Sequence, residues 1–254
     1  MSIHNIRDYI LGLFNNYKKV ENSFKNRYSG SCFIIGNGPS INRLELNKLI
    51  GHYKFVTNRF ILHPDYDKIS PNFYCISDPD FLTMKNQNTL TQIINSVKSN
   101  SDINLFISNR FRMSPRFVRK TPSYLINYIF FQHGKTIFDE KTIETDIKQG
   151  FYFGHTVILD ICIPLAFFMG FKKVYLLGCE SDFSSINSHF YGDFPKVKKQ
   201  AKDISRQKWF NIINTSYGYA RKYFEDNDRE IIDCSLNGKL TTLPKKDYNS
   251  LFIT

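Results

Sequence analysis

Short apolar runs recur along the chain, and each of them stops at polar residues. In the first half they cover residues 32–36, 54–57, 73–77 and 104–108, with helical patterns near 40–50 and 87–98. Runs of this length that are rich in β-branched and aromatic residues are typical of buried strands. Strands that alternate with helices build an open, mainly parallel sheet. The sequence therefore predicts an α/β fold of Rossmann-like type, with helices on both faces of the sheet.

The polar residues that follow these strands are candidates for a binding site. They are Asn37, Asn58, Asp78 and Asn109. Open α/β sheets bind ligands at the carboxyl ends of their strands. A single polar residue after a strand is commonly a turn former, but four in succession favour a pocket at this edge of the sheet.

The first strand ends in the turn Gly36-Asn37-Gly38-Pro39-Ser40, which leads into a helical pattern. Glycines let a backbone approach a ligand closely, and the free N–H groups of a helix start favour an anion. The expected anion is a nucleotide phosphate or the carboxylate of a sugar acid. The alternative is a purely structural turn. Neither the P-loop pattern nor the dinucleotide Gly-x-Gly-x-x-Gly pattern is present.

The same alternation returns in the second half of the chain. Gly154-His155-Thr156 opens an apolar helix that ends at Gly170, a natural C-cap. A strand over 174–178 is followed by Glu180 and Asp182. A long helix over about 196–226 and a last strand over 231–234 complete the pattern.

Two segments differ from this pattern and define the predicted domain organisation. Residues 1–29 form an amphipathic helix that packs on the domain or binds anionic lipid. Residues 30–252 are expected to form one Rossmann-like domain, with a lid or insertion at about 110–150. That insertion carries the cations Arg110, Arg112 and Arg116, which form a solvated basic face or guide an acidic acceptor.

Charge and cysteine content narrow the classes of partner and compartment. The formal net charge of +11 favours phosphates, nucleotides or anionic lipid, but no helix-turn-helix, zinc-finger or RNA-recognition signature points to nucleic acid. The five cysteines lack metal spacing and are expected to be reduced thiols. Without a signal peptide or a long apolar stretch, we expect a cytoplasmic protein, with peripheral contact at the inner face of the cytoplasmic membrane left open.

His189 is the candidate catalytic base. It follows a strand end within the polar sequence Asn187-Ser188-His189-Phe190-Tyr191, and a neutral imidazole can accept a proton from an acceptor hydroxyl. His155 is the rival candidate. Glu180 with Asp182 could bind a ribose, or Mg²⁺ together with Asp78. No Gly-x-Ser-x-Gly elbow is present, so a hydrolase triad has no starting point.

Taken together, these motifs resemble the MptE-like family, named for a 6-hydroxymethylpterin diphosphokinase. The resemblance is carried by residues 34–40, Asn58-Arg59, Ser77-Asp78, 154–178, His189-Phe190-Tyr191 and the tail 237–252. The first strand–turn–helix and the later helix–strand block also resemble bacterial sialyltransferases that use CMP-sialic acid and have a GT-A-variant fold. That resemblance implies nucleotide contacts by Asn37, Gly38 and Asn58, and Asp78 and Thr156 fall near further contact positions of those enzymes. The other nucleotide-binding candidates are Ser40, Gly154, His155 and Glu180.

The same resemblance implies His189 as catalytic base, with Tyr191, Arg110, Arg112 or Arg116 at the leaving phosphate or the acceptor. The loop between Gly178 and His189 is much shorter than in those sialyltransferases. The tyrosines that grip the phosphate in those enzymes have no clear counterpart here.

Three functional hypotheses follow. The preferred one is a glycosyltransferase of cell-surface polysaccharide or lipopolysaccharide biosynthesis, which moves a sialic-acid-like sugar acid from a CMP-activated donor to a glycan or glycolipid hydroxyl with inversion. It requires no cofactor. The second is an ATP- and Mg²⁺-dependent diphosphokinase-type phosphotransferase. The third is a non-catalytic module that binds anionic glycan or lipid. The sequence leaves homo-oligomer formation open.

Overall fold

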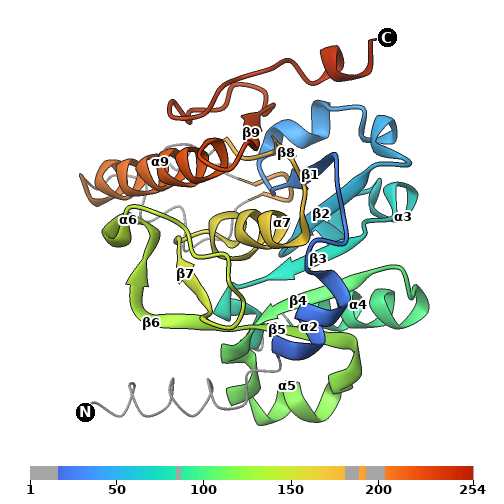
Figure 1. Cartoon of the computed structure of the whole chain (residues 1–254). Coiled ribbons are helices and arrows are strands. Elements are labelled where there is room, and N and C mark those ends of the chain that lie inside the picture. The colour runs from blue at the N-terminus through green and yellow to red at the C-terminus, as the bar shows by residue number, and fades with distance from the viewer. Residues whose placement is uncertain (1–16, 84–86, 181–188, 193–203, 254) are drawn as a thin grey trace.

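The computed structural model describes residues 17–83, 87–180, 189–192 and 204–253. Its centre is a seven-stranded sheet with the order β5-β4-β3-β2-β1-β8-β9, in which every neighbouring pair is parallel (Figure 1). The strands are β1 Ser31–Ile35, β2 Tyr53–Thr57, β3 Phe73–Ile76, β4 Asn104–Ser108, β5 Ile126–Ile129, β8 Lys173–Leu177 and β9 Glu230–Asp233. The predicted α/β, Rossmann-like fold is confirmed.

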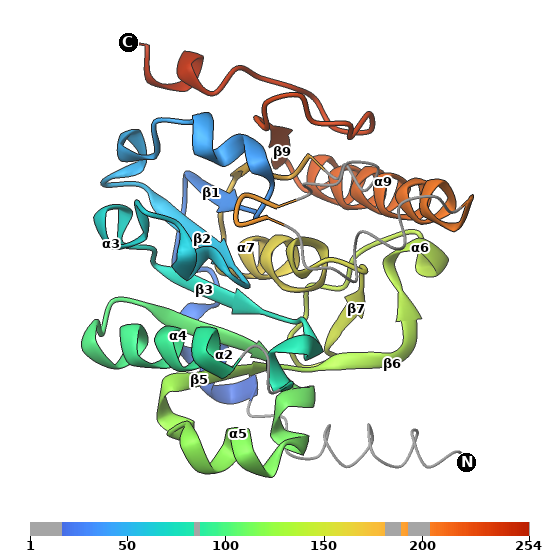
Figure 2. The same ribbon diagram turned by 180° about the vertical axis from the view of Figure 1, so that it is seen from behind.

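Helices cover both faces of this sheet, as the two opposite views show (Figures 1 and 2). The helices are α2 Tyr17–Phe24, α3 Tyr66–Ile69, α4 Gln87–Ser99, α5 Pro115–Lys120, α6 Ile137–Glu140, α7 Ile163–Met169 and α9 Ile204–Glu225. Buried side chains of α2, α7 and α9 pack in one core cluster, and those of α3, α4 and α5 pack in the other. Because both faces are covered, the central strands are largely apolar and do not alternate between polar and apolar residues.

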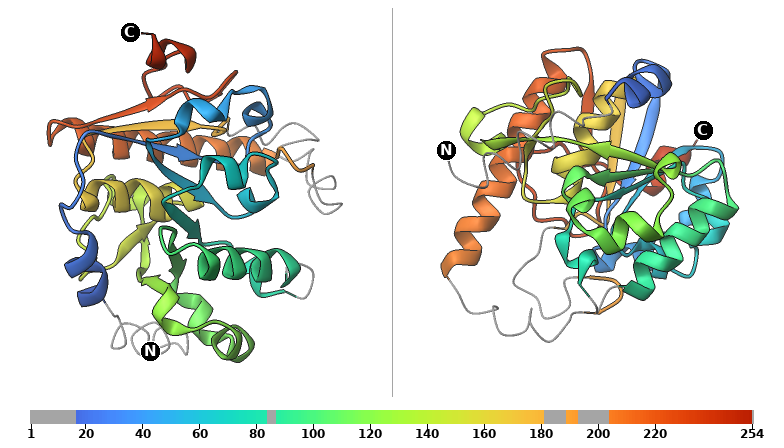
Figure 3. Two further views of the ribbon diagram at one scale, coloured as in Figure 1. Left: turned by 90° about the vertical axis from the view of Figure 1, so that its right-hand side faces the viewer. Right: turned by 90° about the horizontal axis from the view of Figure 1, so that it is seen from below.

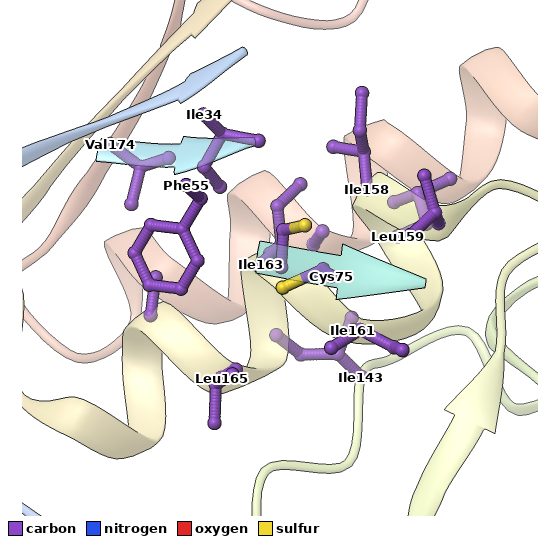
Figure 4. Packing of buried hydrophobic residues seen from close by; sticks show 14 of the residues in the cluster. Ile34, Phe55, Cys75, Ile143, Ile158, Leu159, Ile161, Ile163, Leu165 and Val174 are labelled. Carbon is purple, nitrogen blue, oxygen red and sulfur yellow. The ribbon is translucent and has the colours of Figure 1, made fainter. Parts of the chain in front are cut away.

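Strand β1 shows how the two cores are divided. Cys32 and Ile34 belong to the core with α7, whereas Phe33 and Ile35 belong to the core with α4. Figure 4 shows part of the first core, to which Ile34 and Phe55 of the sheet and Leu165 of α7 all belong. All five cysteines of the chain are buried free thiols.

Two predicted helices differ in form. The pattern near 40–50 forms two short 3₁₀ helices, Pro39–Arg43 and Leu46–Leu49, instead of one α-helix. The helix expected from Gly154 begins later, with a π-helical turn at Ile158–Cys162 before α7. Pro164 has no N–H to donate to the carbonyl four residues earlier, and the Ile163 N–H instead bonds Ile158, five residues back.

The segment 110–150 was expected to stand apart from the sheet repeats, and this is wrong for its middle part. Residues Ile126–Ile129 form β5, which pairs with β4 at one edge of the sheet. The next residues form β6 Phe131–Thr136, which pairs with β7 Phe151–Phe153 in a separate two-stranded sheet. A β-strand signal was present in Ile126-Asn127-Tyr128-Ile129, but the neighbouring cations and aromatics obscured it. The proposed domain boundaries stay a prediction.

The predicted N-terminal helix is described only in part, and the search for a membrane-spanning helix covers the described residues. Residues 1–16 of the predicted helix lie outside the described part, and α2 follows with Val20 and Phe24 buried in the core. In the described ranges, no helix combines the length and apolarity needed to span a bilayer.

Candidate functional site

A cavity of about 460 Å³ opens at the carboxyl ends of the central strands. The chain runs from β1 to β2 on one side and places β8 on the other side of β1, so this edge contains the switch point of the sheet. Such switch points are where open α/β sheets bind ligands. The cavity is lined by residues 153–160, by the loops after β1, β2, β3 and β8, and by side chains from α9. Its polar lining includes Asn37, Asn58, Asp78, Arg110, His155, Thr156, Asp160, Glu180 and His189.

The N–H groups of the glycine turn are largely used within the chain. The Gly36 N–H donates to the Leu177 carbonyl at 2.7 Å and the Gly38 N–H to the Gly178 carbonyl at 2.8 Å. The Ser40 N–H donates to Glu180 Oε1 at 3.0 Å. The anion at this turn is therefore the carboxylate of Glu180. The expectation of free N–H groups for a ligand is wrong, because the loop after β8 packs directly on the turn.

Gly38 is required here by close packing. A Cβ at this position would lie 1.4 Å from Glu180 Oε2 and 2.6 Å from the Gly178 carbonyl oxygen. Glu180 is 6% exposed, and burial raises the pKa of its carboxyl, while the Glu180 and Ser40 N–H groups oppose that shift. Ser40 is also buried and, unlike Glu180, it does not line the cavity.

Two asparagines that line the cavity have side-chain oxygens without a hydrogen-bond partner among the described residues. The Asn37 amide donates to the carbonyl and the hydroxyl of Thr57, both at 3.1 Å. Asn58 adopts a left-handed conformation with φ of 45°, and its backbone carbonyl accepts a hydrogen bond from the Tyr74 hydroxyl at 2.6 Å. The Oδ1 atoms of both asparagines are buried without a hydrogen-bond partner in the described part of the chain. Buried acceptors of this kind fit a ligand that offers N–H or O–H donors.

His189 lines the same cavity, and its ring stacks on the ring of Tyr191. The two rings stack with centroids 5.0 Å apart and an interplanar angle of 14°. Arg59 NH1 donates to the Tyr191 hydroxyl at 3.5 Å, and its guanidinium lies 5.5 Å from the Tyr191 ring centroid. Tyr191 itself lines a neighbouring pocket, so its role at this cavity is through His189.

The backbone between these two rings is also fixed. The Phe190 N–H donates to the Asn37 carbonyl at 2.8 Å. The Asn42 amide donates to the Phe190 carbonyl at 3.4 Å. The predicted base is thereby joined to the glycine turn, about 150 residues earlier in the chain.

Asp78 completes the polar rim near His189. Its carboxylate accepts the Asp80 N–H at 2.8 Å and caps the following 3₁₀ helix. Burial raises the pKa of Asp78, while the charges of Arg59 and His189 lower it. The Asp78 side chain therefore lies near Arg59 and His189.

Asp160 is a second buried carboxyl at the cavity, and the sequence analysis did not identify it. It is 2% exposed and accepts hydrogen bonds from the Gly154 N–H at 2.7 Å and the Ser77 hydroxyl at 3.0 Å. Burial raises the pKa of Asp160 to about 7 despite these bonds. The signal was available, because Asp160 is the one charged residue in the run 157–171.

The Asp160 carboxyl organises the loop that carries His155. The Gly154 N–H is bonded to Asp160, and a Cβ at Gly154 would lie 2.4 Å from Leu159 Cβ, so this glycine serves packing. His155 has a φ of 68° and faces the ring of Phe153 at 4.9 Å. Its pKa is lowered by burial, which favours the neutral imidazole. Thr156 caps the next turn by accepting the Leu159 N–H at 3.3 Å.

The predicted basic cluster is dispersed. Arg110 lines the cavity, 5.7 Å from the Phe153 ring centroid. Arg112 lies over Tyr128 at 4.1 Å, and Arg116 donates to Gln87 at a different pocket. The structure thus brings one of the three arginines to the cavity.

Helix α9 adds two aromatic residues that the sequence analysis also missed. Trp209 and Tyr217 both line the cavity. The Trp209 ring lies 6.4 Å from that of His155, and Tyr217 is 1% exposed. Trp209 is the single tryptophan of the sequence, which is a weak signal by itself.

The Mg²⁺ alternative depended on Asp78, Glu180 and Asp182. Asp182 lies outside the described residues. Over the described ranges, no three His, Cys, Asp or Glu side chains gather as a metal site. Glu180 is engaged with the Ser40 N–H. The metal requirement stays a prediction.

Neither a protein-family model nor a curated protein sequence matches the chain. Among solved structures, it is similar to the sialyltransferase CstII from Campylobacter jejuni in complex with a substrate analogue, cytidine-5'-monophosphate. The sequences are 14% identical, the match covers 86% of this chain and 85% of that chain, and the TM-score is 0.46. The resemblance to the MptE-like family has no family-model match and stays a prediction.

Proposed function

We propose that this protein is a glycosyltransferase that uses a nucleotide-activated sugar. The carrying observation is that His189 lines the same switch-point cavity as Asn37 and Asn58, whose Oδ1 atoms are buried and unfilled. A nucleotide base or ribose supplies the donors that these acceptors lack, and the imidazole supplies a base beside the bound nucleotide.

The proposed donor is a CMP-linked sugar acid of the sialic acid type. Arg110 is the one Arg or Lys among the described residues that line the cavity. One guanidinium matches the single phosphate of a CMP-sugar, whereas the two phosphates of a nucleoside diphosphate are commonly neutralised by a divalent cation. The proposed reaction therefore needs no metal ion.

In the proposed mechanism, His189 accepts the proton of an acceptor hydroxyl. The hydroxyl oxygen forms a bond to the anomeric carbon from the face opposite CMP, and the bond from that carbon to the phosphate oxygen breaks. The configuration inverts, and CMP leaves with the electron pair. Arg110 and the neutral His155 are proposed to stabilise the charge that develops on the departing phosphate.

The proposed acceptor is a glycan or glycolipid hydroxyl in cell-surface polysaccharide or lipopolysaccharide synthesis. This assignment rests on the donor class, since sugar acids are building blocks of such surfaces. Tyr191 and Arg59 are positioning residues, because they hold the ring of His189 and do not line the cavity themselves.

The test is an assay of sugar transfer from CMP-activated sugar acids to a panel of glycan acceptors. The rate is measured as the release of CMP. His189→Ala should bind CMP as the wild type does and lose about 10²–10⁴-fold in kcat, the usual share of general-base catalysis. His133→Ala, an exposed histidine on β6, is the matched control and should keep the wild-type rate. Wild-type turnover in His189→Ala would refute the assignment. Binding of ATP with Mg²⁺ in place of CMP would favour the phosphotransferase.

A further inference from the structure

The surface around α5 exposes apolar and cationic side chains together. It includes the 3₁₀ helix Asn109–Met113 before α5 and the 3₁₀ helix Ser123–Leu125 after it. Met113, Val118 and Tyr124 are 46%, 48% and 73% exposed. We call this surface the α5 face and define it by Met113, Arg116, Val118, Arg119, Lys120 and Tyr124.

Helix α5 is anchored by one residue and open elsewhere. Phe117 is 4% exposed and packs in the core beside Phe111, with ring centroids 5.3 Å apart. The other residues of α5 are exposed. With Phe117 turned inward, Arg116 and Lys120 lie on one flank of the helix and Val118 on the other. The helix thus lies flat on the protein with cations and an aliphatic side chain toward solvent.

The charge of this surface has one sign. The sequence contains no Asp or Glu between Asp102 and Asp139, whereas residues 110–120 contain five Arg or Lys. Arg110 and Arg112 are directed to the cavity and to Tyr128. Arg119 and Lys120 belong to the α5 face, together with Arg116, which also donates to Gln87. A partner surface must therefore be anionic.

A second cavity lies directly beside these cations. It has a volume of about 280 Å³ and lies between α4 and α5. Leu90, Ile94 and Phe117 supply apolar lining, and Lys98, Arg116 and Lys120 supply positive charge. Apolar lining with cations fits a phosphate headgroup joined to a hydrocarbon chain.

From these observations we infer that the α5 face docks on an anionic phospholipid bilayer. Met113, Val118 and Tyr124 enter the headgroup region, while the three cations interact with lipid phosphates. The α5 face lies at the β5 end of the sheet, far from β9 and the C-terminal segment (Figures 1 and 3). Docking at this end leaves most of the molecule away from the bilayer. The inference is independent of the proposed glycosyl transfer.

The test is sedimentation of the full chain with lipid vesicles at low and high salt. The wild type should bind phosphatidylcholine vesicles that contain phosphatidylglycerol, bind pure phosphatidylcholine weakly, and lose affinity as salt rises. Arg119→Gln with Lys120→Gln should weaken binding about 30-fold, because each cation near such a surface contributes about fivefold. Val118→Ser with Tyr124→Ser should also weaken binding, with the salt dependence retained.

The matched control is Lys172→Gln with Lys246→Gln, which removes the same charge from exposed residues outside the α5 face. This control should bind within about twofold of the wild type, and circular dichroism should show that all variants are folded. The inference is overturned if the wild type binds vesicles equally well with and without phosphatidylglycerol. It is also overturned if the α5 variants bind as the wild type does, or if the control loses as much affinity as the α5 variants.

Discussion

Glu180 and Ser40 are 140 positions apart in the sequence and are joined by a hydrogen bond of 3.0 Å. This bond connects the loop after β8 to the glycine turn after β1, across the switch point of the sheet. The turn has the sequence of an anion site, and the protein fills that site with its own carboxylate. Recognition of a ligand phosphate is accordingly proposed for Arg110 and His155, which line the same cavity.

Gly38→Ala should destabilise the protein strongly. The new methyl group would meet Glu180 Oε2 at 1.4 Å and the Gly178 carbonyl oxygen at 2.6 Å, and backbone atoms cannot move aside cheaply. We expect a loss on the order of 3 kcal/mol in the free energy of unfolding, measured by urea denaturation.

Two further variants make this prediction specific. Adding Glu180→Ala to Gly38→Ala should recover part of the loss, because one of the two clashes disappears. Gly218→Ala in helix α9 is the control and should change the stability much less. Its new Cβ would lie 3.2 Å from Thr242 Cβ, and alanine is a better helix former than glycine. Wild-type stability of Gly38→Ala would contradict the packing described here.

Asp160 should make stability depend on pH. Its pKa is about 7 in the folded protein and 3.8 for the ordinary group, so the folded state holds this proton more tightly than the unfolded state. The contribution of Asp160 to stability is therefore greatest below pH 4 and declines as pH rises to about 7. The full decline is at most roughly 4 kcal/mol.

Asp160→Asn isolates this effect, because the amide stays neutral and can still accept from the Gly154 N–H and pair with Ser77. Urea unfolding of both proteins between pH 4 and pH 8 should show the free energy of unfolding of the variant rising relative to that of the wild type up to about pH 7. Above that pH the difference should be constant. Parallel stability curves over the whole range would show that Asp160 does not hold a proton in the fold.

Tyr191 should affect kcat through the ring of His189 and leave nucleotide affinity alone. Tyr191→Phe keeps the stacked ring and loses only the hydroxyl bonded to Arg59, so we expect kcat within about threefold of the wild type. Tyr191→Ala removes the support, and a misplaced base costs about 10–100-fold. Steady-state kinetics with calorimetric CMP affinities separate the two effects. Equal kcat for the Phe and Ala variants would exclude a positioning role.

The sheet was predictable because its strands are continuous apolar runs that end in polar residues. That pattern also predicted Asn37, Asn58, Asp78 and Asn109 at one edge. The structure brings the first three to the cavity, whereas Asn109 is buried and does not line it. Strand β5 was harder to predict from the sequence, because Ile126–Ile129 is short and follows a segment rich in cations.

The misses at the site have physical reasons. Asp160 was overlooked because an acidic residue inside an apolar run gives no indication of its partners, here Gly154 and Ser77. The pairing of Glu180 with Ser40 could not be read from the sequence either. It depends on β8 lying beside β1, a neighbour relationship between strands about 140 residues apart.

The most direct test of the central claim is calorimetric titration of CMP into the wild type and into Asn58→Ala, with Asn95→Ala on the exposed side of α4 as control. The proposal predicts that CMP binds without added metal and more tightly than UMP, GMP or AMP. Loss of one buried hydrogen bond in Asn58→Ala should weaken CMP about 10-fold, while the control binds as the wild type does. Absence of CMP binding, or equal binding by all three proteins, would contradict a cytidine nucleotide site in this cavity.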